Sequence, residues 1–206
     1  MSSASNKQTI VITGASSGIG KATAKHFHAQ GWNVVATMRS PEKETDLKED
    51  ARLKLMRLDV EDKPSIEAAV QASLRAFGKI DVWLNNAGYG TTGPVEAGSD
   101  AEIRRQYDVN FFGVIDCIKA VLPHFKQNKN GMFINITSIG GLLTFPLFGV
   151  YNSSKFALEG LSEGMWYDLQ PFGIKVKVVE PGAIRTDFAG RSLNIFDLKD
   201  FPEYQS

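Results

Sequence analysis

The chain has 206 residues, of which 43% are hydrophobic and 22% are charged. This composition suits a single domain over residues 1–206 with a substantial core. Lysine plus arginine and aspartate plus glutamate each number 23, so the formal net charge is zero. No overall basic field is therefore available to hold nucleic acid or an anionic membrane surface. Cys117 is the sole cysteine, which excludes an intrachain disulfide, and no Cys/His cluster has metal-ligand spacing.

The first seven residues are polar and lack the apolar stretch of a signal peptide. No uninterrupted apolar run is long enough to span a bilayer. We therefore expect a soluble, cytoplasmic protein that does not enter the membrane.

Short runs rich in Val and Ile alternate with segments whose apolar residues recur at helical spacing. The predicted strands are residues 8–13, 33–38, 53–58, 80–84, 131–138 and 174–179. The predicted helices are residues 21–30, 41–50, 64–77, 101–125 (one helix or two in succession) and 151–170. Alternation of this kind indicates right-handed crossovers and a parallel sheet covered on both faces. The sequence predicts an α/β fold, a three-layer doubly wound parallel sheet of the Rossmann type.

Three glycines lie where the first strand becomes the first helix: Gly14, Gly18 and Gly20. Glycines let the backbone approach a pyrophosphate closely, and a helix N-terminus offers free N–H groups and the positive end of a dipole. A simple glycine turn would show the same residues. The position between the first strand and the first helix favours phosphate binding.

Tyr151 and Lys155 are four residues apart in a predicted helix, so they share one face. A nearby ammonium favours the phenolate and lowers the pKa of a tyrosine, which would make Tyr151 a general acid/base. Taken alone, this spacing is far more typical of an ordinary solvated helix.

In combination, these motifs resemble those of the short-chain dehydrogenase/reductase family. The segment 13–20 resembles its cofactor turn, residues 85–88 (Asn-Asn-Ala-Gly) its second motif, and Asn110, Ser138, Tyr151 and Lys155 its catalytic tetrad in order and spacing. Pro181-Gly182 with Thr186 resembles the segment that covers the nicotinamide. Besides Tyr151 and Lys155, the cofactor-binding residues that the resemblance implies are Gly14, Ser16, Ser17, Gly18, Ile19, Gly20, Arg39, Asp59, Val60, Asn86, Ala87, Gly88, Pro181, Gly182, Ile184 and Thr186.

The resemblance implies hydride transfer between nicotinamide C4 and a carbonyl or alcohol carbon, with the protein supplying protons and position. It assigns Tyr151 as proton donor and Ser138 as the hydrogen-bond donor that polarises the carbonyl oxygen. It assigns Lys155 to the phenol and the nicotinamide ribose, and Asn110 to a water that links Lys155 to solvent. Outside this context, Ser138 would be a strand-end cap and Asn110 a polar group at a helix bend.

The end of the second strand distinguishes NAD from NADP, because an acidic residue there binds the ribose 2′-hydroxyl and a basic one accommodates the 2′-phosphate. The usually acidic position corresponds to Thr37, with Arg39 two residues on and no adjacent carboxylate. We expect NADP(H) to be preferred over NAD(H), unless Arg39 merely caps the strand end. Asp59 is either an adenine contact, with Val60 beside it, or a cap on the following turn.

The substrate regions are residues 89–98, residues 139–150 and the segment after Thr186, and the second of these is strongly apolar. An apolar ketone, hydroxysteroid-like molecule, retinoid or long aliphatic alcohol would suit this lining. The same side chains could instead bury at a subunit interface, since the resemblance implies a homodimer or homotetramer through the helices at residues 108–127 and 151–170. Family members also run several tens of residues longer, so we expect the C-terminal part of the fold to be incomplete and strand 174–179 to be an exposed edge.

Two other classes of function remain open. The first is an epimerase or dehydratase on the same fold, although those relatives mostly carry a G-x-x-G-x-x-G turn that this chain lacks. The second is a non-catalytic dinucleotide sensor or scaffold, for which a tuned phenol would serve no purpose.

Overall fold

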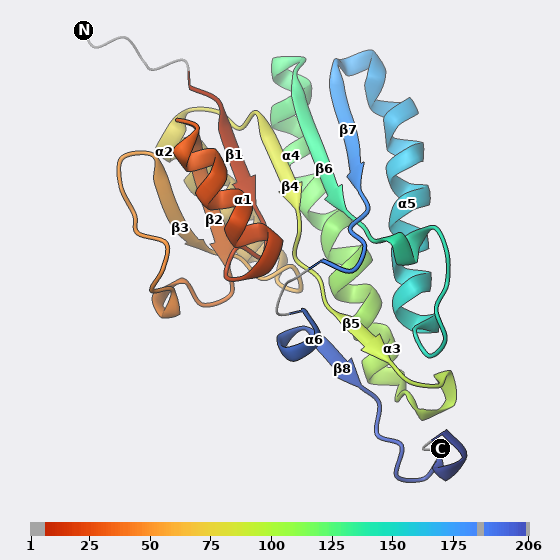
Figure 1. Cartoon of the computed structure of the whole chain (residues 1–206). Helices are drawn as coiled ribbons and strands as arrows, with labels where there is room; N and C mark the ends of the chain where they lie inside the picture. The colour runs from red at the N-terminus through yellow and green to blue at the C-terminus, as the bar shows by residue number, and fades with distance from the viewer. Residues whose placement is uncertain (1–6, 185–187, 205–206) are drawn as a thin grey trace, which may run out of the picture.

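The computed structural model describes residues 7–184 and 188–204. Its centre is a sheet of six parallel strands in the order β3-β2-β1-β4-β6-β7 (Figure 1). The strands are β1 (Thr9–Ile12), β2 (Asn33–Met38), β3 (Leu53–Arg57), β4 (Val82–Asn85), β6 (Gly131–Ile136) and β7 (Ile174–Val179). The predicted doubly wound parallel sheet is confirmed.

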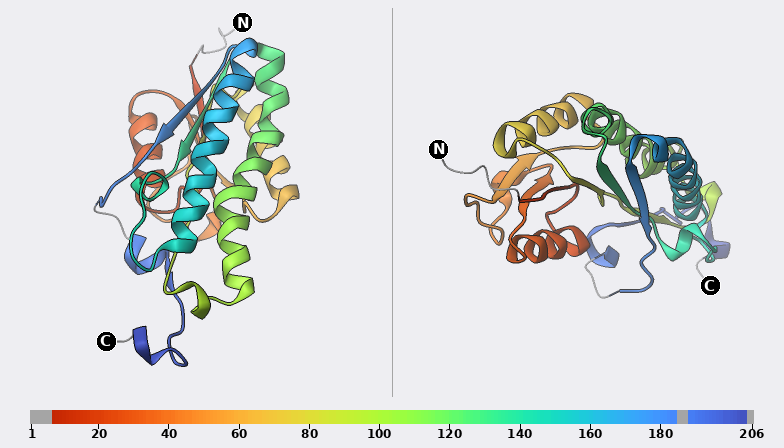
Figure 2. Two further views of the ribbon diagram at one scale, coloured as in Figure 1. Left: turned by 90° about the vertical axis from the view of Figure 1, so that its right-hand side faces the viewer. Right: turned by 90° about the horizontal axis from the view of Figure 1, so that it is seen from above.

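Helices cover both faces of this sheet. One face carries α1 (Gly18–Ala29), and the other carries α2 (Lys63–Phe77), α4 (Gly113–Asn128) and α5 (Gly149–Leu169), as Figure 2 shows from above. The direction of winding reverses between β1 and β4, which are neighbours at the centre of the sheet. The crevice outside the carboxyl ends of the strands at such a reversal is where doubly wound folds bind their ligands.

Two apolar clusters flank the sheet, and a chain of buried polar side chains crosses the larger one. Trp83 Nε1 donates to Asn85 Oδ1 at 2.8 Å, and Asn85 Nδ2 donates to Asn135 Oδ1 at 2.8 Å. Asn135 Nδ2 then donates to Ser162 Oγ at 2.8 Å. Buried polar groups are tolerated when their partners are present, and this chain fixes α5 against β6 and β4.

The predicted helix at residues 41–50 is wrong. Only a 3₁₀ turn forms there, at Pro41–Lys43. The charged side chains that favoured a helix bind the local backbone instead, since the Glu44 carboxylate accepts from the amides of Asp46 (2.7 Å) and Leu47 (3.0 Å). Such side-chain bonds compete with helical backbone bonds.

The predicted helical region at residues 101–125 consists of two helices joined by a π-helical turn. Helix α3 (Asp100–Tyr107) begins at a capping box between Ser99 and Glu102. The π-helical turn (Asp108–Phe112) follows and leads directly into α4. The turn places Val109 and Asn110 in the interior.

A second, two-stranded parallel sheet was not predicted. It pairs β5 (Gly90–Thr92) with β8 (Leu193–Ile195), which follows the short helix α6 (Phe188–Arg191), and it lies beyond the carboxyl ends of the main strands (Figure 1). We call residues 188–204 the C-terminal strap. In the part of the chain that the structure describes, β7 pairs with β6 alone and forms one edge of the main sheet, and no helix there is long and apolar enough to cross a membrane.

Candidate active site

A cavity of about 870 Å³ opens at the carboxyl ends of the strands. It brings together most of the residues predicted from the sequence: Gly14, Ser16, Ser17, Gly18, Ile19, Arg39, Asp59, Val60, Asn86, Ala87, Gly88, Ser138, Tyr151, Lys155, Pro181, Gly182 and Ile184. Gly20 and Asn110 are buried and do not line it. Thr186 lies outside the described residues.

The glycine turn at one end of the cavity is packed directly against the second motif. Gly14 has φ 67°, and a Cβ added to it would lie 2.8 Å from the Ala87 Cα. A Cβ on Gly20 would lie 2.5 Å from Asn86 Nδ2. Both positions require glycine because the neighbouring backbone or side chain fills the space that a larger residue would need.

Hydrogen bonds tie the two motifs together. Asn86 Nδ2 donates to the carbonyl oxygens of Thr13 (2.8 Å) and Gly14 (3.1 Å). The amides of Asn86 and Ala87 both donate to Thr13 Oγ1, at 2.9 and 3.0 Å. The carboxyl ends of β1 and β4 therefore form one rigid floor for a ligand.

The N-terminus of α1 fits an anionic group. No side chain caps it at Ser17, and its first turn carries no acidic residue. The first amides of a helix have no intrahelical partner, and together with the helix dipole they favour a phosphate. The donor set at this turn thus suits the pyrophosphate of a dinucleotide.

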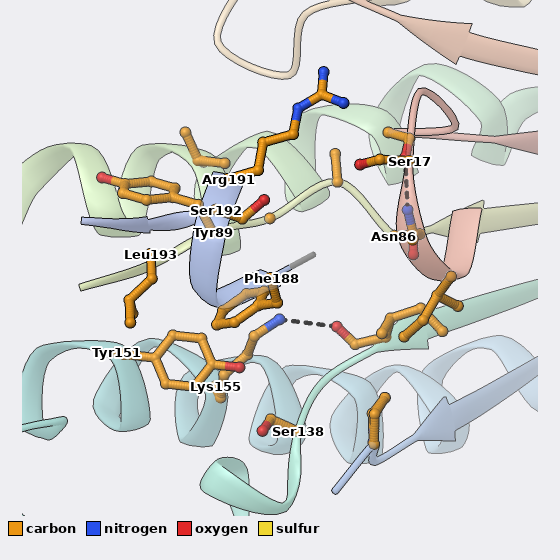
Figure 3. A pocket seen from close by; sticks show the side chains of 18 of the residues that line it. Ser17, Asn86, Tyr89, Ser138, Tyr151, Lys155, Phe188, Arg191, Ser192 and Leu193 are labelled. Carbon is orange, nitrogen blue, oxygen red and sulfur yellow. Dashed lines mark hydrogen bonds between the residues drawn. The ribbon is translucent and has the colours of Figure 1, made fainter. Parts of the chain in front are cut away.

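At the other end of the cavity, Tyr151 and Lys155 project from α5 and Ser138 from the segment after β6 (Figure 3). Lys155 Nζ lies 5.9 Å from the centre of the Tyr151 ring. Ser138 Oγ accepts a hydrogen bond from the amide of Gly140 at 3.0 Å and also bonds to the Tyr151 phenol. The three predicted side chains are therefore neighbours.

The acidity of Tyr151 differs from our expectation. Burial raises the pKa of its phenol, and the hydrogen bond with Ser138 acts in the opposite direction. We had expected Lys155 to lower this pKa. Its ammonium instead turns away to donate to the carbonyl oxygen of Ile136 at 3.0 Å, so desolvation of the phenol is the larger effect.

Lys155 is only 6% exposed. Burial lowers the pKa of its ammonium to about 8, and the charge of Glu159 partly opposes this. A lysine in this range changes its charge close to physiological pH, which is a common property of catalytic sites.

Asn110 lies behind the cavity, in the π-helical turn. Its Oδ1 accepts from the amide of Tyr89 at 3.1 Å, and its Nδ2 donates to the carbonyl oxygen of Tyr89 at 2.9 Å. A Cβ on Gly88 would lie 3.2 Å from Asn110 Oδ1 and 3.7 Å from Lys155 Nζ. The tetrad's Asn and Lys thus approach the same point, and the role of Asn110 in binding a water stays a prediction.

At the end of β2, the position that faces the cavity differs from the one we expected. Thr37 is fully buried, and its Oγ1 donates to the carbonyl oxygen of Ile12 at 3.0 Å. Met38 and the exposed Arg39 line the cavity instead. Neither is acidic, so the absence of a carboxylate at this strand end still holds.

Asp59 caps the turn that follows β3, and its contact with an adenine stays a prediction. It lines the cavity, and its Oδ1 also accepts from the amide of Glu61 at 3.1 Å. Glu61 in turn forms an ion pair with Arg105 at 3.1 Å, and the Arg105 guanidinium lies 5.4 Å from the centre of the Tyr89 ring.

Several lining residues were missed because they come from α3 and the C-terminal strap: Glu102, Arg105, Phe188, Arg191, Ser192, Leu193 and Asn194. The centre of the Phe188 ring lies 6.0 Å from that of Tyr151, and Phe188 stands over Tyr151 and Lys155 in Figure 3. The sequence named the segment after Thr186 as a substrate region, but no local motif in it indicates which side chains face inward.

Comparison with known proteins agrees with this geometry. A family model described as short chain dehydrogenase matches residues 8–194. The 3-ketodihydrosphingosine reductase of Bacteroides thetaiotaomicron is 41% identical over 191 residues, which cover 93% of this chain and 69% of that protein. Human retinol dehydrogenase 8 is 38% identical over 204 residues, covering 95% of this chain and 65% of that one.

Solved structures show the same similarity. A short-chain dehydrogenase from Streptomyces avermitilis superposes with a TM-score of 0.86 at 38% identity, covering 92% of this chain and 72% of that one. ElxO with NADP bound gives 0.83 at 32% identity, with 88% and 75% covered. A short-chain dehydrogenase/reductase from Burkholderia phymatum in complex with NAD gives 0.83 at 30% identity, with 89% and 68% covered. With its fold, its cavity and these relatives in agreement, the chain belongs to the short-chain dehydrogenase/reductase family of pyridine-nucleotide-dependent oxidoreductases.

Proposed function

We propose that this protein is an NADP(H)-dependent oxidoreductase that interconverts an apolar ketone and the corresponding secondary alcohol. The observation that carries the proposal is a single cavity that connects the uncapped N-terminus of α1 to the side chains of Tyr151 and Lys155. A dinucleotide held by its pyrophosphate at one end would reach the ionisable pair at the other.

The bound cofactor supplies or accepts the hydride, and the protein handles the proton. In the reductive direction, Tyr151 gives its phenolic proton to the substrate oxygen as that oxygen gains charge. Ser138 donates a hydrogen bond to the same oxygen, an interaction that strengthens as the charge develops. Lys155, with Asn110 behind it, returns a proton to the phenolate that is left, and solvent reprotonates the lysine.

The lining favours an apolar substrate. Aromatic and aliphatic side chains surround the reacting end of the cavity: Tyr89, Phe145, Phe148, Phe188 and Leu193. Two relatives bear the names 3-ketodihydrosphingosine reductase and retinol dehydrogenase 8, which denote a lipophilic ketone and a lipophilic alcohol. Their names support the substrate class but do not identify the substrate of this chain.

The preference for NADP(H) rests on Arg39. Its guanidinium is exposed at the cavity beside β2, where no acidic side chain competes for the adenosine ribose. Guanidinium groups bind phosphate in a bidentate manner. One solved relative carries NADP and another carries NAD, so the preference is argued from this chain's own residues.

The assembly we propose is a homodimer or homotetramer through α4 and α5. The supporting observation is a set of large apolar side chains that stand exposed on or beside these helices: Phe112, Phe156, Trp166 and Tyr167. Sedimentation equilibrium tests it, since a monomer at micromolar concentration would contradict it.

Oxidation of NADPH by a panel of lipophilic ketones, with the reverse reaction followed from the alcohols, tests the activity. Tyr151→Phe should lose at least about 100-fold in kcat, in keeping with the contribution of general acid/base groups. Its NADPH dissociation constant should stay within about twofold, because the ring remains in place. Full turnover in this variant, or NADPH binding without turnover in the wild type on any substrate, would contradict the proposal.

A further inference from the structure

Helix α5 presents three polar side chains at intervals of four residues to the end of β6. Because i and i+4 side chains share one helix face, Tyr151, Lys155 and Glu159 form a row. Each faces one of three consecutive residues: Lys155 donates to the carbonyl of Ile136, and the side chains of Thr137 and Ser138 lie near enough to Glu159 and Tyr151 to affect their pKa values. The tetrad accounts for the first two, and Glu159 is the third.

Glu159 is packed more tightly than an ordinary surface glutamate. A Cβ on Gly141 would lie 3.1 Å from Glu159 Cγ and 3.2 Å from the carbonyl of Lys155. The backbone after Ser138 therefore rests on this part of α5 and holds the stem of the glutamate. Its Oε1 is buried and has no hydrogen-bond partner, which is costly for a carboxylate unless a nearby charge compensates.

The nearby charge is the ammonium of Lys155. Within the described residues, Glu159 is the one acidic group whose charge acts on Lys155. Their interaction is an electrostatic one through a partly desolvated space, where charges act more strongly than in water.

We propose that Glu159 is a positioning residue for the reaction, which favours the charged form of the Lys155 side chain from one helical turn away. The inference rests on the proposed function for its catalytic consequence. Glu159 would be a fifth residue that acts together with the tetrad, and it lies outside the cavity lining.

The charges that act on this row set the sign of the expected effect. Burial raises the pKa of Glu159, the Thr137 side chain opposes this, Glu180 after β7 adds to the rise, and the charge of Lys155 lowers it. The Glu159 carboxylate favours the ammonium form of Lys155, so its removal should bring the pKa of Lys155 below its value of about 8. With the charged form as the active one, activity is lost as the pH rises through the pKa of Lys155. In a variant that lacks the Glu159 charge, this loss should begin at a lower pH than in the wild type.

The direct test is a titration of the Lys155 Cε resonance by NMR, in protein labelled with ¹³C-lysine and assigned with Lys155→Met. Glu159→Gln preserves the shape and removes the charge, and its Lys155 pKa should shift downward. Glu159→Asp keeps the charge and should restore most of the wild-type value. Glu163→Gln removes the same charge from an exposed position of the same helix, and it should leave the titration unchanged.

The pH profile of kcat/KM with NADPH and a ketone is the second measurement. The alkaline limb should move to lower pH in Glu159→Gln and stay in place in Glu163→Gln. An unchanged Lys155 titration in Glu159→Gln, or an equal shift in both variants, would overturn the proposal. Because the NMR measurement needs no turnover, a shifted titration in a protein without reductase activity would contradict the proposed function and leave the electrostatic role of Glu159 standing.

Discussion

The ring of Phe196 anchors the C-terminal strap, and its removal should open the strap locally. Phe196 is 2% exposed. A Cβ on Gly93 would lie 2.8 Å from this ring and a Cβ on Gly98 2.7 Å from it, so the ring sits directly on two stretches of bare backbone. Phe→Ala in a packed site costs about 3–5 kcal/mol, which corresponds to roughly two to four powers of ten in an equilibrium constant.

The described part of the strap has other attachments besides this ring. They include the β5–β8 pairing, the bond from Asn194 to Glu102 at 3.0 Å and the bond from Tyr204 to Glu96 at 2.8 Å. We therefore expect Phe196→Ala to release the strap without unfolding the main sheet, as weakly held segments open below the global free energy of unfolding. Since the strap contributes Phe188 and Leu193 to the cavity, KM for an apolar substrate should rise while NADPH affinity changes little.

Amide hydrogen exchange measures this opening. The amide of Gly90, which donates to the carbonyl of Ser192 at 2.8 Å, should exchange at least about 100-fold faster in Phe196→Ala. The amide of Thr13, which donates to Leu84 at 3.0 Å in the main sheet, should keep its rate. Tyr204→Phe removes only one exposed hydrogen bond and serves as the control. Unchanged exchange at Gly90, or equal acceleration at Thr13, would refute the reasoning.

Three further predictions follow from single residues. Gly14→Ala combines a φ of 67° with a Cβ 2.8 Å from Ala87, so this variant should lose both thermal stability and NADPH binding. Gly31→Ala is the control, because Gly31 has φ 87° with open space around it. The control should lose only about 1–2 kcal/mol of stability to backbone strain and should bind NADPH normally. Arg39→Ala should raise the NADPH dissociation constant roughly tenfold or more, because a charge-assisted hydrogen bond contributes about 1.5–3 kcal/mol. The NADH dissociation constant should stay unchanged. If titration calorimetry showed equally weakened binding of both cofactors, a contact between Arg39 and the 2′-phosphate would be contradicted. Burial lowers the pKa of Lys155 from 10.5 to about 8 in the folded protein, so the unfolded chain binds more protons between these two pH values. The free energy of unfolding of the wild type, relative to that of Lys155→Met, should therefore rise by about 3 kcal/mol as the pH rises across this window. A difference that does not change with pH in urea unfolding would contradict this prediction.

The sequence was most informative where local geometry alone determines the outcome. A four-residue interval places Tyr151 and Lys155 on one helix face whatever surrounds them, and a glycine turn between a strand and a helix can take few shapes. The alternation of strands and helices likewise restricts the sheet to a parallel one. These features come from spacing, which the sequence displays directly.

Features that depend on contacts between distant segments could not be predicted. No pattern in residues 90–92 indicates that they pair with Leu193–Ile195, and the placement of Phe188 over Tyr151 follows from that pairing. At the end of β2 a shift of one residue changes which side chain faces the cavity, because strand side chains alternate between faces. Both residues are buried, but Met38 lines the cavity whereas Thr37 bonds to the carbonyl oxygen of Ile12. The pKa of Tyr151 depends on burial, which spacing does not reveal.

The π-helical turn at Asp108–Phe112 has a consequence for how the cavity can be altered. Each helical residue advances the chain by about 100° around the axis, so deleting one residue there would rotate α3 by that angle relative to α4. Gln106, whose Nε2 donates to the carbonyl of Tyr89 at 2.9 Å, and Arg105 at the cavity wall would both be re-aimed. Helix α4 is packed on α2 and the main sheet, so it would not rotate about its own axis. Deletion or insertion of a single residue in this turn would therefore change the cavity wall formed by α3 and leave α4 and the main sheet in place.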